Sequence, residues 1–120
     1  MAFDFALVAL PGAYSSSVGA LMDSFLIARD RVEHVFAGEE EMRMETQLHI
    51  LSADGEPVVL GDGRSFPVDG PANGEEPMAF IWLPAFRAGG REPLERRLAE
   101  AGPLIDWLRR QSEMGAVIGA

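Results

Sequence analysis

The chain has 120 residues, enough for one domain, and its formal net charge is −9 because 19 acidic residues outnumber 10 basic ones. This charge excludes direct nucleic-acid binding by these residues, since such binding draws most of its affinity from Lys and Arg side chains that neutralise phosphates. Cysteine is absent, which excludes a disulfide, a thiolate metal site and a cysteine nucleophile within these residues.

The overall composition is that of a folded globular chain, with 48% hydrophobic and 24% charged residues. No apolar run approaches the about 20 residues that a membrane-spanning helix needs. Asp4 stands where a signal peptide would carry basic residues. We therefore expect a cytoplasmic protein with no membrane partner.

The first half of the chain has the pattern of a strand, a helix and a second strand. Residues 5–10 (FALVAL) are apolar and stop at a Pro-Gly pair, as a strand buried on both faces does. Residues 17–35 follow a serine run and carry apolar side chains three and four positions apart, which predicts a helix. Residues 47–52 (QLHILS) predict the second strand. A crossover of this length indicates a right-handed βαβ unit with parallel strands.

The second half predicts a hairpin, a third strand, two helices and a final strand. Residues 57–60 and 65–68 form the hairpin beside the main sheet, and residues 69–77 form a polar loop. This element order predicts an α/β fold: a doubly wound, mostly parallel, flavodoxin-like sheet with helices on both faces. The remaining elements are a strand at 78–83 (MAFIWL), helices at 92–101 and 103–111, and an apolar strand within 115–120 (GAVIGA).

Three features that could hold a cofactor or a metal lack the required spacing. Gly61 and Gly63 have no third glycine and no following helix, so a hairpin turn explains them better than a phosphate loop. His34 and His49 have no companion ligand at metal-binding spacing. The three glutamates at 39–41 are adjacent and cannot face one centre, so they predict a solvated surface. We therefore expect no cofactor and no metal.

The best candidates for a binding site follow the predicted strands. In an open parallel sheet, ligands bind beyond the carboxyl ends of the strands, where the loops diverge. The alternative is that Tyr14 and Phe86 are packing residues and that Arg87 is solvated. The ligand-binding candidates are Gly12, Tyr14, Ser15, Asp54, Ala85, Phe86 and Arg87.

Several motifs occur in one order along the whole chain. They are LPG at 10–12, GALMDSFLIA at 19–28, LSADG at 51–55, WLPAF at 82–86, PLIDWLRR at 103–110 and AVIGA at 116–120. Their order and spacing resemble the N-terminal sensor domain of AraC-type transcription regulators, which has a PfpI-like, class I glutamine amidotransferase-like fold. In that family the strand matching 116–120 leads into the nucleophile elbow. The resemblance implies that residues 1–120 are the N-terminal part of such a domain, ending before the elbow.

The resemblance implies a non-enzymatic domain that senses a small-molecule effector and forms a homodimer. DNA would be bound only through a C-terminal helix-turn-helix domain outside these residues. Hydrolytic members of the superfamily carry a glutamate after the first strand and a glycine-rich turn after the third. Here the first loop reads GAYSSS at 12–17, without a carboxylate, and the turn reads PAF at 84–86, with the glycines displaced to 89–90. Two alternatives stay open: a PfpI-like or amidotransferase-like cysteine hydrolase or isomerase ending before its nucleophile, and a small α/β interaction protein.

Overall fold

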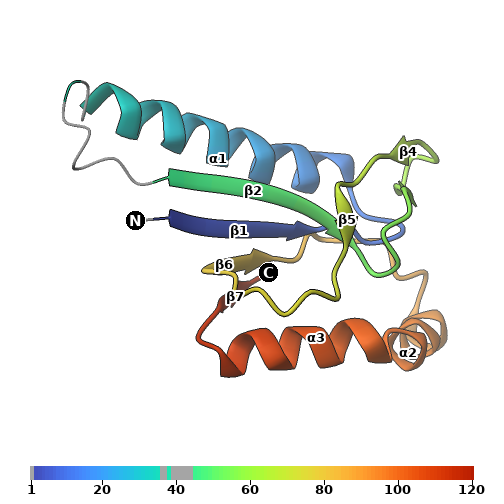
Figure 1. The fold of residues 1–120 in the computed structure, drawn as a ribbon. Coiled ribbons are helices and arrows are strands. Elements are labelled where there is room, and N and C mark those ends of the chain that lie inside the picture. Colours follow the sequence, from blue (N-terminus) through green and yellow to red (C-terminus); the bar gives the residue numbers. More distant parts are fainter. Residues whose placement is uncertain (1, 36–37, 39–44) are drawn as a thin grey trace.

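The computed structural model describes residues 2–35, 38 and 45–120, which form a central sheet with helices on both sides (Figure 1). The main sheet has five strands in the order β5-β2-β1-β6-β7, and each neighbouring pair is parallel. A separate antiparallel pair contains β3 and β4. The elements are β1 (Ala2–Val8), α1 (Ser15–Val35), β2 (Glu45–Ser52), β3 (Val58–Val59), β4 (Ser65–Phe66), β5 (Gly70–Pro71), β6 (Phe80–Trp82), α2 (Arg91–Glu100), α3 (Gly102–Glu113) and β7 (Val117–Gly119).

This architecture confirms the predicted α/β fold with its mostly parallel sheet. One strand was not predicted: β5 lies inside the segment 69–77 and pairs in parallel with the end of β2. The prediction that this segment is only a loop is therefore wrong at 70–71. The two residues of β5 are glycine and proline, which are uncommon inside strands, so the sequence pattern concealed it. The glutamates at 39–41 lie outside the described residues, and within the described residues no helix combines the length and apolar character needed to cross a membrane.

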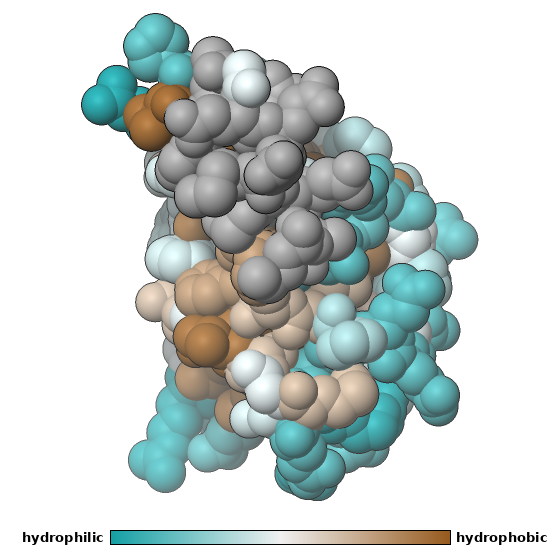
Figure 2. Space-filling view, turned by 60° about the vertical axis from the view of Figure 1, so that its left-hand side comes forward, coloured by the Kyte–Doolittle hydropathy of each residue, from teal (hydrophilic) through white to brown (hydrophobic). Residues whose placement is uncertain are grey.

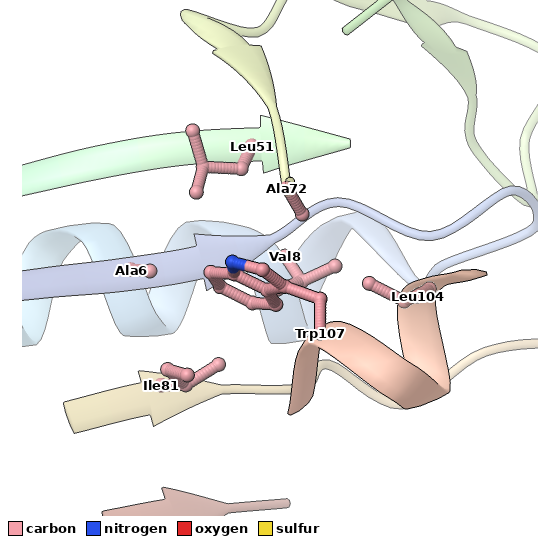
Figure 3. Packing of buried hydrophobic residues seen from close by; sticks show 7 residues of the cluster. All are labelled: Ala6, Val8, Leu51, Ala72, Ile81, Leu104 and Trp107. Carbon is pink, nitrogen blue, oxygen red and sulfur yellow. The ribbon is translucent and has the colours of Figure 1, made fainter. Parts of the chain in front are cut away.

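β1 lies at the centre of the sheet, and its second half, residues 6–8, is buried on both faces. Ala6 and Val8 pack on the side of α3, whereas Leu7 packs on the side of α1, as the alternation of side chains along a strand requires. Figure 3 shows the α3 side, where the Trp107 ring lies among Ala6, Val8 and Ile81. Burial on both faces is why the sequence of this strand reads as a continuous apolar run.

Two polar side chains of α3 fix the segment that precedes β6. The indole nitrogen of Trp107 donates a hydrogen bond to the carbonyl of Gly74 at 2.9 Å. The side chain of Gln111 accepts from the backbone N–H of Met78 and donates to the carbonyl of Glu76, both at 2.8 Å. Trp107 and Gln111 are both buried. Because a buried polar group without a partner is costly, these bonds explain how a polar segment packs against an apolar core.

Three aromatic residues and one valine lie side by side on the face of β1, β6 and β7 that is on the α1 side. We call these four residues, Phe5, Phe80, Trp82 and Val117, the aromatic strip. The Phe80 ring lies 6.4 Å from Phe5 and 5.4 Å from Trp82, measured between ring centroids. Gly119 leaves room for this packing, since a Cβ atom there would come within 2.9 Å of the Phe80 ring. Val117 is 58% exposed. Figure 2 brings forward the end of the molecule where β1 and β2 begin, and it shows apolar residues gathered on the surface at that end.

Replacing Gln111 with leucine should lower the free energy of unfolding by about 1–3 kcal/mol, because the N–H of Met78 and the carbonyl of Glu76 lose their buried partner. Urea unfolding measures this change. The neighbouring variant Ser112→Ala is the control, since Ser112 is exposed, and it should stay within about 0.5 kcal/mol of the parent. An unchanged stability of Gln111→Leu would show that these hydrogen bonds do not hold the segment.

Candidate functional site

Three backbone segments meet beyond the carboxyl ends of β1 and β6. They are residues 12–14, 59–61 and 85–87, and we call them together the edge ribbon. Arg87 N–H donates to the carbonyl of Gly12, and Tyr14 N–H donates to the carbonyl of Ala85, both at 2.9 Å. The hairpin joins from the other side, where Gly12 N–H donates to Val59 at 2.8 Å and the N–H of residue 61 donates to residue 13 at 2.9 Å. Loops that are far apart in sequence are thereby held in one fixed surface.

Two glycines allow these segments to come so close. Gly12 has a φ of 77°, a conformation that residues with a Cβ atom rarely adopt. A Cβ atom at Gly61 would lie 3.1 Å from the carbonyl oxygen of Gly12 and 3.3 Å from Cδ of Arg87. The Pro-Gly and Gly-Asp-Gly patterns predicted turns at these places. They gave no sign that the two turns contact each other.

The edge ribbon has a core face and an exposed face. Ala13 and Phe86 pair across an antiparallel bridge and pack in the cluster on the α1 side. Since side chains alternate along extended segments, their neighbours Tyr14, Ala85 and Arg87 face the opposite way. All three are exposed, and Tyr14 is 48% exposed. The structure thus brings five of the candidates together and separates their roles: Phe86 packs, whereas the residues on the exposed face are open to a ligand.

Ser15 and Asp54 lie outside the edge ribbon. Ser15 is the first residue of α1, directly after Tyr14. Asp54 belongs to the loop after β2, where its carboxylate accepts hydrogen bonds from Glu56 N–H at 3.0 Å and from the Ser52 hydroxyl at 3.4 Å. These local bonds hold Asp54 in its own turn. Among the described residues, no hydrogen bond joins Asp54 to the edge ribbon.

Arg97 braces the site and was missed in the sequence. Its guanidinium donates hydrogen bonds to the carbonyl of Arg87, at 3.0 Å, and to the carbonyl of Pro11. It also lies 4.3 Å from the centroid of the Phe86 ring, within the range of a cation–π contact. Arg97 is half-buried and follows Leu94 by three residues, so both lie on the inner side of α2. The spacing from Leu94 could have indicated that Arg97 faces the core. An arginine in a charged helix is normally interpreted as solvent-exposed, so this indication was overlooked.

Two of the backbone N–H groups in the turn after β6 are already used. Ala85 N–H donates to the hydroxyl oxygen of Ser17 in the first turn of α1 at 3.0 Å, and Arg87 N–H donates to Gly12. An oxyanion site requires N–H groups that are free to meet a developing negative charge. Ala85 and Arg87 therefore do not offer such donors in this arrangement.

The two histidines lie away from the edge ribbon. His49 Nε2 is 3.2 Å from a carboxylate oxygen of Asp4, and both side chains are partly exposed near the start of the sheet. His34 is exposed in the last turn of α1. Across the described ranges, no three His, Asp or Glu side chains gather in a way that could hold a metal ion. A shallow surface depression lies on α2, lined by Glu92, Glu95, Arg96 and Ala99.

No protein-family model matches the chain, and no curated protein matches it in sequence. Solved structures share its fold. A protein of Vibrio parahaemolyticus assigned as a transcriptional regulator aligns with a TM-score of 0.73 and 19% identity, over 98% of this chain and 55% of its own. An AraC family transcriptional regulator of Pseudomonas putida aligns with a TM-score of 0.59 and 15% identity, over 98% and 63%. DJ-1beta of Drosophila melanogaster gives a TM-score of 0.58 and 19% identity, over 98% and 54%.

These similarities concern the fold, because the identities are low. Two transcriptional regulators and two DJ-1 proteins thus share the overall fold of this chain. The resemblance noted in the sequence is thereby confirmed at the level of the fold. The chain spans between 54% and 63% of the length of the three structures described above.

Replacing Arg97 with alanine should loosen the edge ribbon without unfolding the sheet. Two hydrogen bonds from a charged donor are lost, and such a bond contributes about 1.5–3 kcal/mol before solvent screening. We expect amide hydrogen exchange at Gly12, Tyr14 and Arg87 to become roughly tenfold faster, which corresponds to about 1.4 kcal/mol.

The control is Arg96→Ala, which removes the same charge from an exposed neighbouring position. Exchange at Ala9, whose N–H donates to the carbonyl of Leu51 beside β1, should be unchanged in both variants. Equal exchange rates in Arg97→Ala and Arg96→Ala at the edge ribbon would rule out the bracing role.

Proposed function

We propose that this chain is the N-terminal part of the ligand-sensing and dimerising domain of an AraC-type transcription regulator, and that it is not an enzyme. The observation that carries the proposal is the edge ribbon. Its core face is locked into the fold, while its exposed face presents Tyr14, Ala85 and Arg87 where ligands bind to open parallel sheets. The similarity in fold to two transcriptional regulators supports the same function.

Two observations support a longer parent protein. Almost the whole chain aligns with little more than half of each regulator structure. The aromatic strip also leaves Trp82 and Val117 incompletely covered, whereas both faces of a parallel sheet are normally covered by helices. In this proposal the segment that follows residue 120 covers the strip, and a helix-turn-helix domain follows it. The acidic charge of residues 1–120 is then compatible with DNA binding by the whole protein.

The effector would act by shifting a population of dimers. A small molecule that prefers one arrangement of the two copies stabilises that arrangement, which sets the distance between the two helix-turn-helix domains. Leu26, Ile27 and Val35 leave large apolar side chains exposed on α1, which makes this helix a candidate surface for the second copy. We place such a regulator in the cytoplasm, where its DNA is.

A cysteine hydrolase or isomerase is the second candidate, and the fold similarity to DJ-1 superfamily proteins is the observation in its favour. It requires a cysteine soon after β7 and an acid or base that activates it. The loop after β1 offers serines instead of a carboxylate, and the N–H groups of Ala85 and Arg87 are engaged. The sensor proposal requires none of these groups and is therefore preferred.

Replacing Ala85 with leucine in the full-length regulator should remove the response to the effector while DNA binding persists. The larger side chain covers part of the exposed face that carries Tyr14 and Arg87. A thermal-shift screen of small metabolites first identifies the compound that most raises the melting temperature. A transcriptional reporter then measures the response to it, which we expect to fall at least tenfold in Ala85→Leu.

The matched control is Ala53→Leu, which adds the same group to an exposed loop residue outside the edge ribbon, and its response should equal that of the parent. A parental response in Ala85→Leu would contradict a sensor site on the edge ribbon. A screen in which no compound stabilises the full chain would contradict ligand sensing itself.

A further inference from the structure

The side chain of Arg87 lies across the exposed face of the edge ribbon. Its Cδ would be 3.3 Å from a Cβ atom at Gly61, so the absent side chain of that glycine makes room for the arginine stem. The guanidinium reaches the far segment, where one nitrogen is 3.5 Å from the carbonyl of Gly61. This distance is at the limit of a hydrogen bond, so the guanidinium retains most of its capacity to donate.

The charge of Arg87 is not neutralised by a carboxylate of the described residues. Other arginines have such partners: Arg64 lies 3.7 Å from Asp62, and Arg91 lies 3.2 Å from Glu95. Arg97 uses its guanidinium on backbone carbonyls, among them the carbonyl of Arg87. The edge ribbon thus exposes one arginine without a carboxylate partner among the described residues, in a chain whose net charge is −9.

The neighbours of Arg87 on the exposed face are suited to the rest of a small molecule. Tyr14 supplies an aromatic ring that is 48% exposed. Ala85 is the third exposed residue of this face, where its backbone carbonyl accepts from Tyr14 N–H, and it adds only a methyl side chain. A planar guanidinium binds carboxylates through two parallel hydrogen bonds, which a lysine cannot reproduce.

We propose that the edge ribbon binds a small organic carboxylate, with Arg87 holding the carboxylate and Tyr14 contacting an apolar or aromatic body. This inference rests on the sensor function proposed above and adds the chemical class of the effector. Arg97 is a positioning residue in this account, because it fixes the carbonyl of Arg87 and the loop that carries it. Tyr14 and Arg87 are the residues that touch the ligand.

Benzoate and benzamide test the proposal, because they share size and shape and differ in charge. Isothermal titration calorimetry on the full-length regulator should show benzoate binding at least tenfold more tightly than benzamide. Arg87→Ala should abolish this preference, and Arg87→Lys should lose most of it because the bidentate geometry is lost. Arg64→Ala removes an equal charge from the nearby hairpin and should keep the preference.

Each other outcome counts against the inference in a recognisable way. Equal binding of benzoate and benzamide would overturn the carboxylate assignment while leaving a ligand site on the edge ribbon. A benzoate preference that survives in Arg87→Ala, or that Arg64→Ala removes equally, would show that Arg87 does not select the ligand. Failure of both probes to bind would also overturn the carboxylate proposal. The reporter response of Ala85→Leu would still test the sensor function independently. Arg87→Lys is the control for misfolding, because lysine keeps the positive charge and an aliphatic side chain of similar length.

Discussion

The structure depends on how the backbone leaves β1. The end of this strand is buried on both faces, so the chain that leaves it must turn at Pro11 and Gly12 and find partners for its polar groups close to the core. The partners are the hairpin on one side and the segment after β6 on the other. Gly12 is bonded to both, through its N–H to Val59 and through its carbonyl to Arg87. The edge ribbon is therefore a consequence of burying the end of β1, residues 6–8, on both faces.

This solution determines what the site can do. Two backbone N–H groups after β6 already have partners in the fold, since Ala85 donates to Ser17 of α1 and Arg87 donates to Gly12. What remains available is the exposed face, with an aromatic ring, a small residue and a guanidinium. Such a set can bind and orient a ligand.

The sequence was sufficient for the fold because two kinds of pattern were clear. The apolar runs at 5–10 and 78–83 are continuous, as in strands buried on both faces, and the helix between β1 and β2 carries apolar side chains three and four positions apart. It was insufficient where structure comes from contacts between distant segments. β5 has only two residues, so no periodicity can reveal it. Arg97 belongs to a charged helix, and its bonds to the carbonyls of Pro11 and Arg87 depend on how α2 packs. Asp54 was grouped with the site because β2 ends beside β1, yet its local turn keeps its carboxylate within the loop.

The most direct test of a ligand site on the edge ribbon is a crystal structure of the full chain grown with 4-bromobenzoate, whose bromine is located by its anomalous scattering. We expect an anomalous peak from the bromine over the exposed face, near Tyr14, with the carboxylate in contact with the guanidinium of Arg87. A peak elsewhere, such as the depression on α2 beside Arg96, with the face of the edge ribbon empty, would contradict it.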